Sequence, residues 1–204
     1  MNIRELQEVQ LDALREVANI GAGHAATALS QLTSSRIGVQ VPRLTITSVE
    51  EVPDLVAPPE QVVASVLMHM LGDLSGRTLL ILPWATARQL AEILLRRPAG
   101  MITELGEMER SAVKEAGNIL SGAYMNALSD FMGMMLLPSV PHLVVDYWSA
   151  VLTTIYSDFS GQDEYALSIE TQFSIESHGS LPGHFLLIPG EGSLEAILRA
   201  VRLG

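Results

Sequence analysis

The chain has 204 residues, of which 48% are hydrophobic, and its 12 basic and 23 acidic residues give a formal net charge of −11. This length suits one domain or two small ones, and the apolar content argues against intrinsic disorder. The acidic balance disfavours nucleic acid and anionic lipid as partners, while the absence of cysteine excludes disulfides and thiol chemistry and indicates a reducing, cytoplasmic setting.

The first half of the chain predicts a long helix, a set of strands and a shorter helix. Residues 6–33 have helical periodicity, Ile37–Ile46 alternates as a strand does, and Gln61–Met70 and Arg77–Leu82 form a predicted hairpin. Trp84–Arg97 is helical in period. The buried stripe expected for the first helix is Leu11, Leu14, Ala18, Ala25, Leu29 and Leu32.

The second half repeats this order. It predicts a long helix over Glu104–Gly133, strands over Val144–Tyr156 and Tyr165–Ile175, a strand over His184–Ile188 after a turn at residues 182–183, and a closing helix over Gly192–Leu203. The strand over Val144–Tyr156 is ambiguous from residue 147 onward. The expected polar stripe of the second long helix is Ser111, Glu115, Asn118, Gly122, Met125 and Ser129.

The two halves share a polar motif with identical spacing, 99 residues apart. Both copies have the pattern [DS]-x3-E-x2-N-x22-P, and a glycine follows each asparagine by four residues. The first copy consists of Asp12, Glu16, Asn19, Gly23 and Pro42, and the second of Ser111, Glu115, Asn118, Gly122 and Pro141. A second match, between the segments that begin at Gly76 and Gly183, has an offset of 107, which predicts an eight-residue insertion at residues 157–164.

This duplication predicts a single pseudo-twofold domain of the α/β (α+β) class, built of two repeats at about residues 6–100 and 104–203. Because hairpins join the strands more often than helical crossovers do, the sheet is expected to be mainly antiparallel or mixed.

The repeated motif has two interpretations. Glycine and alanine residues such as Gly23 and Ala25 could let the two long helices pack closely, with the polar residues merely solvated. Alternatively, Glu16 and Asn19 share one helix face that docks a partner, and Gly23 leaves bare backbone beside the asparagine. An asparagine amide can orient a water molecule, as suits a phosphoryl-transfer reaction whose electrophile and metal belong to the substrate. Duplication of both polar residues favours the second interpretation.

The two motifs resemble the signature of the CheC/CheX/FliY family of bacterial chemotaxis phosphatases, and the resemblance extends over essentially all 204 residues. With two intact copies of the motif and this length, the chain is similar to the CheC branch of the family, since CheX is shorter and FliY carries an added flagellar switch domain. The resemblance implies a pseudo-symmetric domain with the two motif helices side by side. It also implies an enzyme that hydrolyses the aspartyl-phosphate of the response regulator CheY.

The resemblance implies a role for each motif residue. Asn19 and Asn118 would orient the attacking water, and Glu16 and Glu115 would pair with a lysine of the receiver domain. Supporting contacts would come from Asp12 and Ser111, and Pro42 and Pro141 would be structural. Magnesium would belong to the bound receiver, and the chain would need no cofactor of its own. The receptor deamidase CheD is a further expected partner, and the isolated chain is expected to be a monomer.

Other sequence signals are weaker. The segment Gly21–Ala26 matches a dinucleotide-binding pattern, but a helix precedes it where a strand is required. The five histidines show no metal-binding spacing, so no metal site is expected. No apolar run is long enough to span a membrane, and no signal peptide is recognisable. The alternative function is a non-catalytic adaptor that binds a receiver domain or CheD.

Overall fold

The protein contains six α-helices and seven strands in the residues described by the computed structural model, which are 8–156, 165–175, 179–190 and 192–203. The predicted insertion at residues 157–164 lies outside them. The elements are α1 (Glu8–Thr33), β1 (Ile37–Ser48), a 3-10 turn η2 (Val49–Glu51), α2 (Val52–Val56), β2 (Val62–Gly72), β3 (Gly76–Pro83), α3 (Trp84–Leu94), α4 (Glu107–Met132), β4 (Leu136–Pro138), β5 (His142–Tyr147), α5 (Trp148–Tyr156), β6 (Tyr165–Ile175), β7 (Gly179–Pro189) and α6 (Ser193–Leu203).

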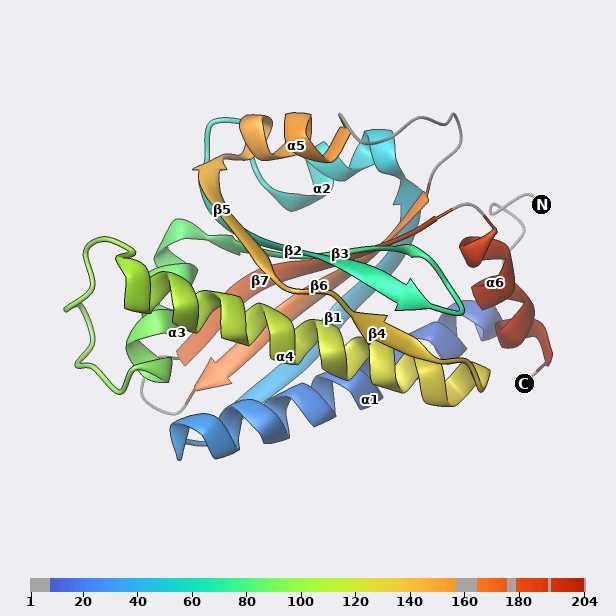
Figure 1. The fold of residues 1–204 in the computed structure, drawn as a ribbon, viewed down its shortest axis with the longest axis horizontal. Helices are drawn as coiled ribbons and strands as arrows, with labels where there is room; N and C mark the ends of the chain where they lie inside the picture. The colour runs from blue at the N-terminus through green and yellow to red at the C-terminus, as the bar shows by residue number, and fades with distance from the viewer. Residues whose placement is uncertain (1–7, 157–164, 176–178, 191, 204) are drawn as a thin grey trace.

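The strands form one seven-stranded sheet in the order β1-β6-β7-β3-β2-β4, with β5 also paired to β2 (Figure 1). Every strand pairing in this sheet is antiparallel. The predicted α+β class and antiparallel sheet are therefore confirmed.

The two halves of the chain are interleaved in this sheet. The hairpin β2–β3 belongs to the first half and the hairpin β6–β7 to the second, and they meet at the β3–β7 pair. The strands that follow the long helix of each half pair with the hairpin of the other half: β1 with β6, and both β4 and β5 with β2. This exchange joins the two halves through backbone hydrogen bonds, although the division into repeats at residues 6–100 and 104–203 stays a prediction.

Helices cover both faces of the sheet. The long helices α1 and α4 lie side by side and antiparallel on one face together with α3, and α2 and α5 lie on the other (Figure 1). The larger core lies beneath the long helices and includes Leu29, Val66, Leu80, Leu120 and Phe185. A smaller core under α2 and α5 includes Trp148, Val151 and Leu186. Such two-sided covering buries the apolar residues of both sheet faces.

The structure corrects the prediction after residue 147. The strand ends at Tyr147, and Trp148–Tyr156 is the helix α5. The side chains of Trp148, Val151 and Leu152, spaced three and four residues along the helix, are buried in the smaller core, and Trp148 Nε1 donates to the carbonyl of Pro53 at 3.2 Å. A short run of aromatic and β-branched residues fits either period, and here packing decides for the helix.

The turn predicted at residues 182–183 is also wrong. Both residues lie within β7, where Pro182 is opposite Gln172 and Gly183 opposite Thr171. A Cβ at Gly183 would lie 2.9 Å from Leu82 Cδ2, so close packing accounts for the glycine. The strand β4 has no counterpart among the predicted elements, because three residues are too few to show a strand period.

Candidate functional site

The first motif lies on the outer surface of α1. The side chains of Asp12, Glu16 and Asn19 are exposed, and the spacings of four and three residues place them on one helix face. The side chains that hold α1 on the core follow the same period on the opposite side and include Leu14, Ala18, Ala25 and Leu29. Packing of that stripe fixes which way the motif faces. Leu32, predicted to continue the stripe, is 45% exposed.

The second motif lies on α4 in the same way. Ser111 and Glu115 are exposed, and Asn118 is partly exposed. Opposite them, Val113, Ala116, Leu120 and Ala127 are buried against the core. Met125, predicted on the polar stripe, is in fact only 1% exposed and belongs to the core.

The glycines of the motif are open to solvent. A Cβ added at Gly23 or at Gly122 would meet no atom within 4 Å. The interpretation in which Gly23 lets the helices pack is therefore wrong. Both positions present bare helical backbone one turn beyond an asparagine, so a partner could approach closely at each.

Other glycines make the close contacts. A Cβ at Gly21 would lie 2.6 Å from Tyr124 Cδ1 and 3.0 Å from Tyr124 Cα, so α1 and α4 touch there. A Cβ at Gly117 would lie 2.5 Å from Val66 Cγ1 in the sheet below. Neither glycine follows the 99-residue repeat, because Gly21 corresponds to Leu120 and Gly117 to Ala18. The repeat thus keeps glycine at the two exposed positions, Gly23 and Gly122, and does not keep it at the positions where a glycine makes a close packing contact.

The two motif faces differ in their local contacts. On α1, Arg15 Nη1 donates to Asp12 Oδ1 at 2.6 Å, and Thr27 Oγ1 donates to the carbonyl of Gly23 at 2.9 Å. On α4 the residue equivalent to Asp12 is Ser111, which cannot form an ion pair with Lys114. The charge of the Asp12 carboxylate is therefore partly balanced by Arg15, although this ion pair is exposed and contributes little to stability.

The prolines of the motif lie in or between the strands that follow the motif helices, and not on the exposed helix faces. Pro42 is in β1, where the register with β6 shifts between Gln40 and Arg43. Pro141 lies in the gap between β4 and β5, where Ser139 bonds to the backbone of His69 in place of a regular ladder. Both prolines therefore interrupt strands that follow the motif helices, as suits a residue without a backbone donor.

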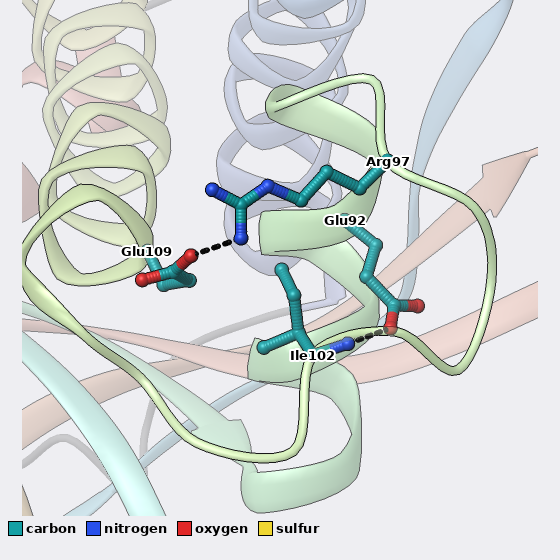
Figure 2. A network of polar contacts seen from close by, with 4 residues as sticks. All are labelled: Glu92, Arg97, Ile102 and Glu109. Atoms are coloured by element: carbon teal, nitrogen blue, oxygen red, sulfur yellow. Dashed lines mark hydrogen bonds and ion pairs between the residues drawn. The ribbon is translucent and has the colours of Figure 1, made fainter.

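A polar network at the start of α4 was not foreseen from the sequence. Arg97 Nη1 donates to Glu109 Oε1 at 2.5 Å, and the backbone amide of Ile102 donates to Glu92 Oε1 at 2.8 Å (Figure 2). Glu92 and Glu109 are both buried. These contacts join α3, the connecting loop and the first turn of α4, so they help to position the helix that carries Glu115 and Asn118. No sequence spacing signals them, since the partners lie 10 and 12 residues apart.

Ionisable groups in the protein interior belong to the core and not to the motif faces. Burial raises the pKa of Tyr124 to about 12, and the ring packs against Phe185 with a centroid distance of 4.5 Å. In the described parts of the chain, no three histidine, aspartate or glutamate side chains converge as a metal site requires. Nor does any helix in those parts have the length and apolarity to cross a membrane.

The sequence of this chain matches those of known proteins, and the matches include the two segments that form these helix faces. The chain is 37% identical over 199 residues to the CheY-P phosphatase CheC of Bacillus subtilis, covering 96% of this chain and 95% of that protein. The chain belongs to the CheC-like family. The family model matches it twice, at residues 9–46 and 108–145, and these segments contain the two complete motifs. Their offset is again 99 residues, which confirms the internal repeat.

One further relative and one solved structure that resembles this CheC-like chain carry the name FliY. The flagellar motor switch phosphatase FliY of Bacillus subtilis is 32% identical over 128 residues, which is 62% of this chain but 33% of that protein. The crystal structure of Thermotoga maritima FliY superposes with a TM-score of 0.77 at 20% identity and covers 98% of both chains. That similarity concerns the fold alone.

Proposed function

We propose that this CheC-like chain accelerates hydrolysis of the aspartyl-phosphate of a CheY-type response regulator. We base the proposal on one observation: an exposed glutamate, an asparagine and an open glycine share one helix face, and this arrangement occurs on both α1 and α4. The names of the relatives, CheY-P phosphatase and flagellar motor switch phosphatase, support the same reaction class.

In this proposal the asparagines act on water. Asn19, or Asn118 at the second site, enters the active site of the bound receiver, where its amide donates or accepts a hydrogen bond and holds water in line with the phosphorus. The water oxygen then attacks, the bond between phosphorus and the aspartyl oxygen breaks, and inorganic phosphate and the free carboxylate are released. Positioning of this kind accounts for most of the catalysis in phosphoryl transfer, so no covalent intermediate on this chain is needed.

The glutamates dock the receiver. Glu16 and Glu115 are exposed and lie one helical turn before the asparagines, so each can pair with a lysine of the partner. Asp12 and Ser111 support the contact from the turn before. Gly23 and Gly122 allow the partner's backbone to come close on the other side of each asparagine. Magnesium belongs to the receiver in this scheme, and this chain supplies no cofactor.

The partner set and cellular location follow from the same proposal. The substrate is a phosphorylated CheY-type receiver in the cytoplasm, CheD is a second protein partner, and the isolated chain is a monomer. A non-catalytic adaptor would use the same exposed faces to bind a receiver or CheD. We favour the enzyme because docking alone does not require an amide at the same position of both faces.

The decisive test is turnover. The aspartyl-phosphate of a CheY-type receiver, held in large molar excess over this chain, should disappear faster than it does alone, and phosphate should appear at the same rate. Receiver binding should be measured in parallel by titration. Binding without accelerated decay, even with CheD present, would refute the enzyme and leave the adaptor.

A further inference from the structure

The motif stripe of α1 continues beyond Gly23 into a shallow surface hollow. The hollow is lined by Ala26, Thr27, Ser30, Gln31, Arg36 and Ile37, from the end of α1 and the start of β1. Thr27 is eight residues after Asn19, which places it about 12 Å farther along the helix axis. A protein docked on Asn19 through an interface of ordinary size, about 800 Å² on each partner, would extend over this hollow.

The corresponding region of α4 has the opposite charge. By the 99-residue repeat, Gln31 corresponds to Asp130 and Arg36 to Met135. Arg36 and Asp130 are both exposed, and Met135 is 58% exposed. Asp73 adds a second carboxylate beside Met135, because its Oδ2 accepts from the Met135 amide at 2.8 Å. The first motif is therefore flanked by a cation and the second by anions.

Both charges are available to a partner. Within the described residues, neither Arg36 nor Asp130 forms an ion pair or a side-chain hydrogen bond. Arg36 just after α1 has an ordinary structural explanation, since a cation is favourable near a helix C-terminus. Asp130 has no such structural explanation. It lies in the last turn of α4, where the helix dipole disfavours an acidic residue and no basic residue in that turn balances its charge.

We infer that Arg36 and Asp130 are specificity-determining residues that give the two motif faces opposite electrostatic preferences for the docked receiver. This inference rests on the proposed function. Arg36 and Asp130 are not equivalent positions, but both lie in the region beyond the motif glycine. If one receiver docks on both faces through the same motif, the same part of the receiver therefore faces the region that holds Arg36 at one site and the region that holds Asp130 at the other. Whatever net charge that part of the receiver carries, one face attracts it and the other repels it.

Single-site variants separate the two faces. In Asn118→Ala only the α1 face is catalytic, and in Asn19→Ala only the α4 face. We expect Arg36→Ala to change kcat/KM about two- to fivefold in the first background, and Asp130→Ala to change it by a similar factor in the opposite direction in the second, the magnitude expected of exposed charge pairs. The changes should appear in KM, with kcat retained, and should diminish at high salt.

Three controls make the result specific. Arg36→Lys keeps the charge and should retain the kcat/KM of its background. Glu60→Ala removes an exposed charge from the loop before β2, as Asp130→Ala does from α4, and should leave both backgrounds unchanged. Each flank substitution should also have no effect in the background whose active face lies on the other helix.

Two outcomes would overturn the inference: no change with either substitution, or changes in the same direction. If neither background accelerates phosphate loss, the proposed function fails separately. The inference is then judged by titrating the same variants with a beryllofluoride-activated receiver. Opposite shifts in affinity would support it, and equal or absent shifts would overturn it.

Discussion

Replacement of Gly23 by alanine should stabilise the protein and impair its function. A Cβ at this position meets no atom within 4 Å, and the residue lies in the interior of a 26-residue helix. Alanine is favoured over glycine in such a position by about 0.8–1 kcal/mol. For a chain of this size, that corresponds to a rise in melting temperature of about 2–4 °C. The same substitution at Gly122 should add independently, because the two sites share no contact.

Function should change in the opposite direction. If a receiver's backbone approaches Gly23 and Gly122, two added methyl groups would hold it away from both asparagines. A displacement of about 1 Å in such a geometry can lower the rate by about 100-fold. The assay is the decay of the receiver's aspartyl-phosphate with the Gly23→Ala/Gly122→Ala chain, beside thermal unfolding of the same sample.

Gly21→Ala is the matched control two residues away. Its Cβ would lie 3.0 Å from the Tyr124 Cα, so backbone must move, and such overpacking costs about 1–3 kcal/mol. The reasoning is refuted if Gly23→Ala destabilises the chain, because the position would then not be open. It is equally refuted if the double alanine variant is stabilised yet keeps full phosphatase activity.

Two further predictions concern the scaffold. Arg97→Met should lower the free energy of unfolding by about 1–3 kcal/mol in urea titrations, because it leaves the Glu109 carboxylate, 10% exposed, without its donor; a change below about 0.5 kcal/mol would contradict this. Burial lowers the pKa of His184 below 6.5 against the opposing charge of Glu170. As the pH falls, the unfolded chain therefore binds a proton at His184 at a higher pH than the folded chain does. The contribution of neutral His184 to the free energy of unfolding should be fully present above pH 6.5 and should decline as the pH falls toward the folded pKa. His184→Gln should flatten that decline, and an equally steep one would contradict the assignment.

Local patterns were sufficient to predict the motif helices. Over 26 residues a helical period is unmistakable, so α1 and α4 and the outward position of Glu16 and Glu115 could be predicted from the sequence. The exchange of strands between the halves could not be predicted, because β1 and β6 are separated by more than a hundred residues and no local pattern encodes their pairing.

The two glycines of α1 show where sequence reasoning reaches its limit. Gly21 and Gly23 are two residues apart, so they lie on different helix faces, and composition does not say which face meets α4. Repetition of Gly23 at Gly122 indicated a shared role, and the structure shows that both are open. The packing role of Gly21 depends on Tyr124 of the other helix, which only the tertiary fold brings into contact.

One measurement tests the central proposal most directly: the first-order decay of receiver aspartyl-phosphate at a saturating concentration of the Asn19→Ala/Asn118→Ala chain. If the asparagines orient water, decay should fall to the receiver's own rate while its affinity for the chain is retained. The Glu16→Ala/Glu115→Ala chain should show the converse, with weaker binding but residual acceleration at saturation. Fast decay with both asparagines removed would contradict the account, because the catalytic group would then lie elsewhere.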